Sequence, residues 1–133
     1  TRIIVETFRE HGVPVKEFYA AGGIAKKDSM TMQIYADVLN MPVKIAGSDQ
    51  GGALGSAIFG SVAAGRQNGG YDNVFDAALV MGKVLDTVFN PIKENVIIYN
   101  ELFKEYKTLH DYFGKGENNV MKRLKSIKKS LSQ

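Results

Sequence analysis

Apolar residues in the first half of the chain switch several times between helical spacing and strict alternation. Spacings of three and four residues predict helices at residues 2–11, 28–40 and 48–64. Alternation predicts strands at residues 16–21 and 43–46, and each of these strands ends at a glycine. The order helix, strand, helix, strand, helix is typical of an α/β layer and argues against a helical bundle.

The second predicted helix carries an apolar stripe. Met30, Ile34 and Val38 lie on one side of it, and Tyr35 and Leu39 widen this stripe. We expect this helix to be largely buried. Asp28 or Ser29 is expected to cap its first turn, because short polar side chains accept hydrogen bonds from the free amide groups there.

The third predicted helix is rich in small residues. Its apolar row consists of Leu54, Ile58 and Val62, and its row of small residues consists of Gly52, Ser56, Gly60 and Ala64. Each glycine inside a helix costs about 1 kcal/mol relative to alanine, so Gly55 and Gly60 indicate tight packing against another element. We favour such packing over contact with a ligand. Ser48 or Asp49 is the expected cap.

The second half of the chain is predicted to contain three more helices. The first covers residues 72–81, and Pro91 opens a long one over about residues 92–113. Along the long helix runs a stripe of Tyr99, Leu102, Phe103, Tyr106, Leu109 and Phe113. Such a stripe is more typical of a core than of a ligand site. The third is a basic amphipathic helix within residues 115–133, and whether it packs on the rest of the chain, on an acidic partner or on an anionic surface stays open.

Composition limits the available chemistry. The 133 residues are 44% hydrophobic, which is ample for a core. No segment approaches the roughly 20 apolar residues of a membrane span, and no signal peptide is recognisable, so we expect a cytoplasmic protein without a membrane partner. Because the chain has no cysteine and only two histidines, His11 and His110, no metal site built from its side chains is expected. The chain begins at Thr1 in a predicted helix, and we expect it to be part of a larger protein.

The net charge of +3 is unevenly distributed. Residues 115–133 hold six Lys or Arg and one acidic residue, whereas residues 1–114 hold 11 basic and 13 acidic residues. The basic segment has no aromatic residue on which bases could stack, so binding of nucleic acid is not expected.

The strongest candidate for chemistry is the junction between the first predicted strand and the helix that follows it. Gly22 and Gly23 allow a sharp turn that can approach an anion, and the next residues supply free amide groups and the cations Lys26 and Lys27. The segment matches neither GxxxxGK[ST] nor GxGxxG. A nucleotide phosphate site and a purely structural glycine turn both remain open on this pattern alone.

Three blocks of sequence resemble the FGGY carbohydrate kinases. They are residues 21–27 (AGGIAKK), 32–39 (MQIYADVL) and 52–57 (GALGSA), in the family's order and spacing. Within the family they are most similar to the ribulokinase branch. The resemblance implies an α/β, RNase H-like (actin-like ATPase) fold with two domains and ATP bound between them. Residues 1–114 would be the C-terminal part of the second, nucleotide-binding domain, and residues 115–133 would be a tail helix.

The resemblance also implies roles for individual residues. Gly22 and Gly23 match the glycines that approach the nucleotide phosphates, and Lys26 or Lys27 falls where the family often places a residue that contacts adenosine. The turn is one residue longer than in glycerol kinases, which leaves open which lysine takes that place. The catalytic aspartate and most sugar contacts would lie upstream of this segment.

The implied reaction is phosphorylation of L-ribulose to L-ribulose 5-phosphate in L-arabinose catabolism, with ATP and nucleotide-carried Mg²⁺. The partners would be ATP or ADP and a ketopentose held mainly by the missing domain. We expect the chain alone to be inactive and to expose apolar surface that allows homo-oligomerisation. The alternative is a non-catalytic interaction module in which the glycine turn is only structural.

Overall fold

The computed structural model describes residues 1–116 and 118–131. The chain divides into two compact units, Thr1–Lys93 and Glu94–Gln133, and each is described by itself. The boundary that we expect after residue 114, between the nucleotide-binding part and the tail helix, differs from the boundary between these units and stays a prediction.

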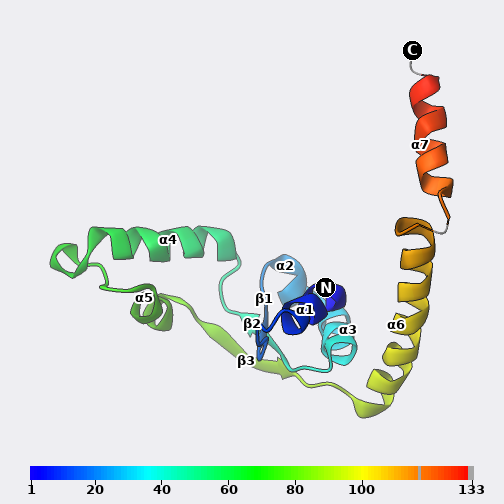
Figure 1. Cartoon of the computed structure of the whole chain (residues 1–133). Helices are drawn as coiled ribbons and strands as arrows, with labels where there is room; N and C mark the ends of the chain where they lie inside the picture. The colour runs from blue at the N-terminus through cyan, green and yellow to red at the C-terminus, as the bar shows by residue number, and fades with distance from the viewer. Residues whose placement is uncertain (117, 132–133) are drawn as a thin grey trace. The chain divides into compact units, whose positions relative to one another are not determined.

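The first unit contains the predicted alternation of helices and strands (Figure 1). Its elements are α1 (Arg2–Glu10), β1 (Phe18–Ala20), α2 (Gly23–Lys27), α3 (Ser29–Leu39), β2 (Val43–Ala46), α4 (Gly51–Ala64), the 3₁₀ turn η1 (Arg66–Asn68), α5 (Val74–Met81) and β3 (Val84–Phe89). The predictions of α1, β1, α3, β2, α4 and α5 are confirmed, with ends that differ by a few residues. The short helix α2 and the strand β3 were not predicted.

The three strands form one mixed sheet in the order β1-β2-β3. β1 pairs with β2 in parallel, with Phe18 opposite Val43, whereas β2 pairs with β3 antiparallel, with Val43 opposite Phe89. In β3 the apolar residues come in pairs, as VLDTVF, and do not alternate. This is why the pattern along the chain did not reveal the strand, which becomes recognisable only through its pairing with β2.

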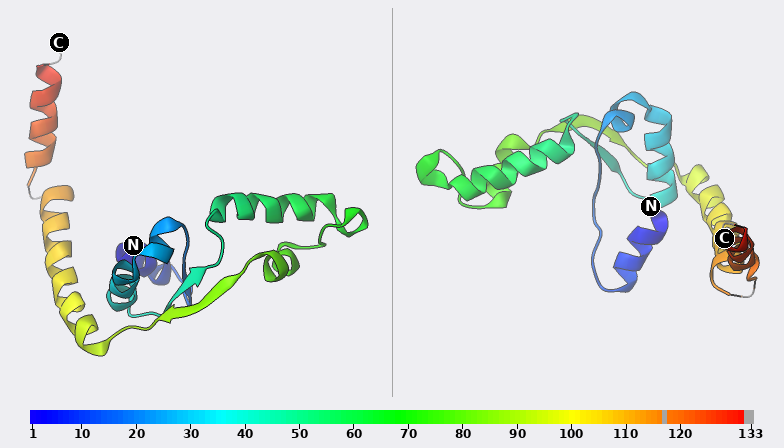
Figure 2. Two further views of the ribbon diagram at one scale, coloured as in Figure 1. Left: turned by 180° about the vertical axis from the view of Figure 1, so that it is seen from behind. Right: turned by 90° about the horizontal axis from the view of Figure 1, so that it is seen from above.

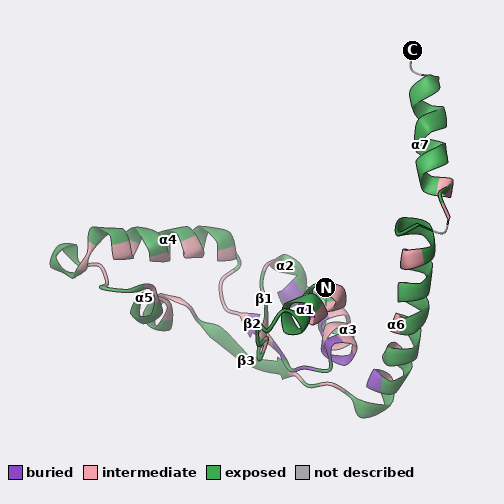
Figure 3. Cartoon of the chain, in the orientation of Figure 1, coloured by how far each residue is buried: buried purple, intermediate pink, exposed green. Residues whose placement is uncertain are grey.

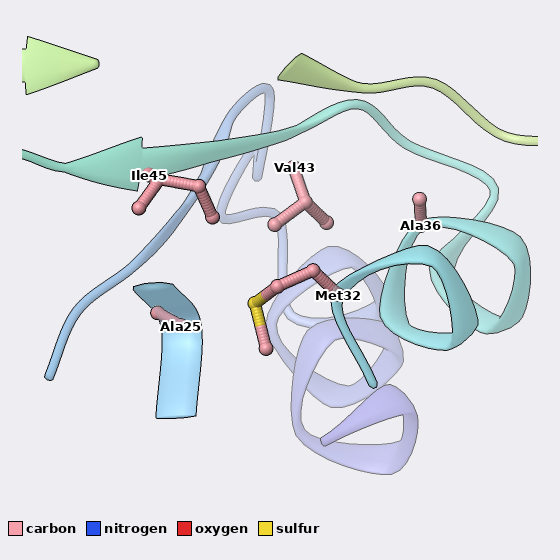
Figure 4. Close-up of a cluster of buried hydrophobic side chains, with 5 residues drawn as sticks. All are labelled: Ala25, Met32, Ala36, Val43 and Ile45. Carbon is pink, nitrogen blue, oxygen red and sulfur yellow. The ribbon is translucent and has the colours of Figure 1, made fainter. Parts of the chain in front are cut away.

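The main core lies between β2 and the helices α2 and α3. It consists of Ala25, Met32, Ala36, Val43 and Ile45. Figure 4 shows Val43 and Ile45 pointing from β2 toward Met32 and Ala25. A second cluster joins Val5 of α1 to Leu39 and Met41.

The buried side of α3 agrees only in part with the predicted stripe. Met32, Ala36 and Leu39 are buried, whereas Met30 is 72% exposed and Ile34 and Val38 are half-buried. Apolar residues occur on both sides of this helix, so the position of β2, and not spacing alone, decides which side is covered.

Asp37 on α3 is a buried carboxylate that holds the segment after β3. Its Oδ1 accepts hydrogen bonds from Gln33 Nε2 at 2.9 Å and from the amide of Ile92 at 2.8 Å. Gln33 Nε2 also donates to the carbonyl of Asn90 at 2.8 Å. The contacts to Asn90 and Ile92 join residues more than 50 positions apart in sequence and fix the chain where it leaves the sheet.

The predicted caps have different outcomes. Asp28 caps α3 as expected, because its carboxylate accepts from the amide of Thr31 at 2.9 Å. For α4 the prediction is wrong: the N-cap is Gln50, whose side chain makes no capping bond. The hydroxyl of Ser48 instead accepts from the amide of Gln50, at 3.1 Å, before the helix begins.

α4 packs on α5 through only one of its rows, and the two helices lie side by side in Figures 1 and 2. Leu54, Ile58 and Val62 are half-buried, but no residue of α4 is fully buried, as Figure 3 shows. A Cβ added at Gly55 or Gly60 would meet no atom within 4 Å among the described residues. The expected tight packing at these glycines is therefore wrong for this chain, because α5 covers the apolar row and not the row of small residues.

The second unit consists of α6 (Lys93–Gly114, which starts one residue before the unit boundary) and α7 (Val120–Ser130). Both helices were predicted, and residues 117, 132 and 133 of the predicted tail lie outside the described residues. The aromatic stripe does not form a core: Leu102, Tyr106, Leu109 and Phe113 are 44–58% exposed. None of the helices in the described ranges combines the length and apolar character that a bilayer span requires.

Candidate functional site

The predicted site residues lie at the carboxyl ends of the two parallel strands. β1 ends at Ala20 and β2 at Ala46, and because the strands are neighbours and parallel, the turns that follow them lie at the same edge of the sheet. We call residues 21–23 the first glycine turn and residues 47–50 the second glycine turn. In open α/β sheets this edge is where ligands bind.

The first glycine turn is open to its surroundings. Gly22 has φ 92° and ψ −179°, a conformation that residues with a side chain rarely adopt, and this alone explains a glycine there. Gly23 has no positive φ, and a Cβ at either position would meet no atom within 4 Å. The described part of the fold therefore does not explain the glycine at position 23, which leaves free space beside the backbone.

The second glycine turn is closely packed. The amide of Gly47 donates to the carbonyl of Lys83 at 2.7 Å, and a Cβ on Gly47 would lie 2.9 Å from both Cβ and the carbonyl oxygen of Lys83. Glycine is required here by the approach of the chain that leads into β3. Sequence reasoning treated Gly47 only as the end of a strand, since its neighbour Lys83 is distant in sequence.

Lys26 joins the two turns. Its ammonium donates to the carbonyl of Gly47 at 2.6 Å and forms an ion pair with Asp49 Oδ1 at 2.7 Å. The hydrogen bond from Lys26 and its positive charge lower the pKa of the Asp49 carboxyl below its usual value, and the charge of Lys27 adds to this effect. Asp49, expected as a cap, is thus the acidic partner of a lysine from the neighbouring turn.

The two candidate lysines have different surroundings. Both lysines are exposed residues, but the side chain of Lys26 is 25% exposed and is engaged in both contacts. Within the described residues, the side chain of Lys27 makes no hydrogen bond and no ion pair. The structure therefore places both lysines near the two turns but distinguishes them by their contacts.

The start of α4 also belongs to this edge. A Cβ on Gly51 would lie 3.4 Å from Cβ of Ala21, so α4 begins beside the first glycine turn. The N-cap side chain of Gln50 makes no capping bond, which leaves first-turn amide groups of α4 available. The sequence signal for this arrangement is the pair Gly51-Gly52, of which only Gly52 was interpreted, as part of the row of small residues.

A groove adjoins the second glycine turn. Its lining residues are Gly47, Ser48, Leu54, Met81, Lys83, Val84 and Leu85. It encloses about 350 Å³, a volume that suits a small organic group. The groove is lined mainly by apolar side chains and backbone, so it suits an uncharged, flat or apolar part of a ligand.

Neither carboxylate near the site has the properties of a general base. The hydrogen bonds from the hydroxyl and amide of Thr31 lower the pKa of Asp28, and Lys26 lowers that of Asp49. Both are therefore held as ionised groups with structural partners. What the site offers is backbone amides, free space and positive charge, which suit binding of a phosphorylated ligand.

Comparison with known proteins gives this arrangement a context. Residues 1–64 match the model of the C-terminal domain of the FGGY family of carbohydrate kinases. Proteins named ribulokinase are similar over nearly the whole chain: that of Bacillus licheniformis is 61% identical over 128 residues, 96% of this chain, and that of Geobacillus thermodenitrificans is 55% identical over 130 residues, 98% of this chain. In both cases the chain spans 23% of the relative's length.

A solved structure supports the fold. The ligand-bound xylulose kinase from Lactobacillus acidophilus matches 76% of this chain and 19% of its own, with a TM-score of 0.63 and 20% sequence identity. At this identity the likeness concerns the fold alone. It confirms the expected α/β class, as part of a larger sugar-kinase fold.

Proposed function

Through residues 1–64 this chain belongs to the FGGY family of carbohydrate kinases, and on that premise we propose that it is the C-terminal part of an ATP-dependent sugar kinase. Residues 1–114 would complete the nucleotide-binding domain, and residues 115–133 would form a basic tail helix. The names of its relatives point to L-ribulose as the acceptor, with L-ribulose 5-phosphate as the product in a cytoplasmic pathway of arabinose catabolism.

The openness of the first glycine turn carries this proposal. Gly23 is explained neither by backbone conformation nor by packing against the described residues, but a ligand that approaches the backbone there would require it. The turn lies at the carboxyl ends of β1 and β2, beside first-turn amides of α4. Amide groups and positive charge at this edge would bind the phosphates of ATP, and Mg²⁺ would be carried by the nucleotide.

The intact enzyme would divide its task between two parts. This chain would orient the nucleotide, and an aspartate from the remaining polypeptide would deprotonate the sugar hydroxyl that attacks the γ-phosphorus in line. Closure of the two parts would exclude water and align the reactants. The isolated chain is therefore expected to be inactive, and sugar-dependent formation of ADP by the pure chain would contradict this.

The site assignment is tested by Gly23→Val in the full-length enzyme. The added side chain occupies the space proposed for phosphate, so we expect KM for ATP to rise about tenfold, the effect of losing one good phosphate contact, while KM for the sugar changes little. Gly60→Val is the matched control, because Gly60 also has free space but lies on α4, away from the turn. Unchanged ATP kinetics in Gly23→Val would reject the assignment.

A second candidate function is favoured by one observation, the exposed apolar stripe of α6. Leu102, Tyr106 and Leu109 are each more than half exposed, as an interaction module would require. In that case binding of a partner protein or a second copy would survive Gly23→Val and would be lost on deletion of residues 115–133 or on Leu102→Glu. Sedimentation over a range of concentrations distinguishes self-association from a monomer.

A further inference from the structure

We infer that Lys26 and Asp49 form a positioning pair that holds the two glycine turns together, and that Lys27 is the lysine that contacts the nucleotide. This inference rests on the proposed function of the same site. It assigns different roles to two adjacent lysines that sequence and resemblance left equivalent.

The first argument is that the ammonium of Lys26 is already engaged. It has three donors, and two of them are directed at the carbonyl of Gly47, 2.6 Å away, and at Asp49 Oδ1, 2.7 Å away. Hydrogen bonds in which the donor is charged are stronger than neutral ones. If the side chain of Lys26 turned away from these partners to reach a ligand, both contacts would break and Asp49 would lose Lys26 as its partner.

The second argument concerns what Lys26 is attached to. Gly47 is held by its hydrogen bond to the carbonyl of Lys83 and has no room to move toward that residue. The contact of Lys26 therefore ties the short helix α2 to a packed part of the sheet. α2 has five residues, of which only Ala25 is buried, so the first glycine turn has few other anchors.

The third argument is that Lys27 remains available at the same place. It is exposed, and its charge lies close enough to Asp49 to contribute to the lowered pKa of that carboxyl. Its position at the end of α2 keeps it within the segment that follows the open turn. Within the described part of the chain, the side chain of Lys27 can therefore approach an anionic ligand without breaking a hydrogen bond or an ion pair.

A double-mutant cycle in the full-length enzyme tests the pair. For Lys26→Met and Asp49→Asn we expect KM for ATP to rise about two- to fivefold in each single variant, as for loss of an exposed ion pair, and no further in the double variant. KM for the sugar should stay unchanged and the thermal midpoint should fall only slightly, as for loss of one exposed ion pair, which distinguishes a positioning role at the nucleotide site from a general structural one. Lys26→Arg should retain most of the wild-type affinity for ATP.

Two further variants complete the test. Lys27→Met should raise KM for ATP both in the wild type and in Asp49→Asn, as expected if Lys27 contacts the nucleotide itself. Glu17→Gln is the matched control, because Glu17 forms a comparable ion pair with Lys44 at 2.6 Å but precedes β1, at the opposite end of the strand from the turns. It should leave ATP kinetics unchanged.

Several results would contradict this inference, and each identifies the part that is wrong. If Lys26→Met weakens ATP binding while Asp49→Asn leaves it unchanged or strengthens it, Lys26 contacts the nucleotide directly and the inference is wrong. Additive effects of Lys26→Met and Asp49→Asn, or no effect of Lys27→Met, would also overturn it. Gly23→Val is measured in parallel. If it leaves ATP binding unaltered, the proposed nucleotide site itself is wrong. If it weakens ATP binding but the effects of Lys26→Met and Asp49→Asn are additive, only the roles assigned to Lys26, Asp49 and Lys27 are wrong.

Discussion

The first and second glycine turns lie at the same edge of one sheet but require glycine for different reasons. Gly47 is glycine because the carbonyl and Cβ of Lys83 occupy the space of a side chain, 2.9 Å from an added Cβ. Gly22 is glycine because of its positive φ, and Gly23 has neither constraint within the described residues. One turn is thus closed by packing and the other is open, which is the difference expected between a supporting and a ligand-binding segment.

The largest effect on stability is expected for Gly47→Ala. The new Cβ would collide with backbone and not with the end of a flexible side chain, so we expect a loss of roughly 2 to 3 kcal/mol in the free energy of unfolding. Urea-induced unfolding followed by circular dichroism measures this loss. Gly55→Ala is the matched control, since an added Cβ there meets no described atom within 4 Å, and it should be neutral or slightly stabilising. Equal free energies of unfolding for Gly47→Ala and Gly55→Ala would show that contact with Lys83 does not explain the glycine at position 47.

A smaller loss is expected for Gly22→Ala. Alanine has to adopt φ 92°, and the resulting backbone strain is about 1 to 2 kcal/mol although no atom is in the way. Gly23→Ala, by contrast, should change the free energy of unfolding by no more than about 0.5 kcal/mol. A large destabilisation by Gly23→Ala would show that the fold itself needs this glycine and would weaken the case for a ligand.

The smallest effect is a dependence on pH that originates in the second turn. Because Lys26 lowers the pKa of Asp49, folding favours the ionised carboxylate, and this contribution is present above the pKa of an unfolded aspartate. It is lost as the pH falls through the lower pKa of the folded state. In Lys26→Met the free energy of unfolding should therefore fall less steeply on acidification than in the wild type, as measured by urea unfolding at several acidic pH values. Parallel curves for the two proteins would show that the ion pair does not form in solution.

Much of the first unit could be predicted from local signals. The spacing of apolar residues located α1, α3, α4 and both parallel strands, and the polar side chain of Asp28 correctly marked the start of α3. The pairing partners and the packing could not be predicted in this way. β3 has no alternating pattern, and the buried side of α3 depends on where β2 lies.

In the candidate site, too, the residues could be selected from the sequence but their contacts could not. Gly22, Gly23, Lys26 and Lys27 were selected from sequence and resemblance, but nothing in their spacing indicates that Lys26 reaches Gly47 and Asp49, more than 20 residues away. Asp49 was expected to cap α4, since a short polar residue before a helix usually does. Tertiary structure instead gives its carboxylate a cation from the neighbouring turn.

The sequence by itself determined every α-helix except α2, the parallel strands, the glycine turn and the family, because these depend on residues that are close together along the chain. Only the tertiary structure decided which glycine is closed by packing, which is open, and which of two adjacent lysines is already engaged. The physical reason is that free space, steric contact and charge pairing depend on distances between segments, which the order of residues along the chain does not specify.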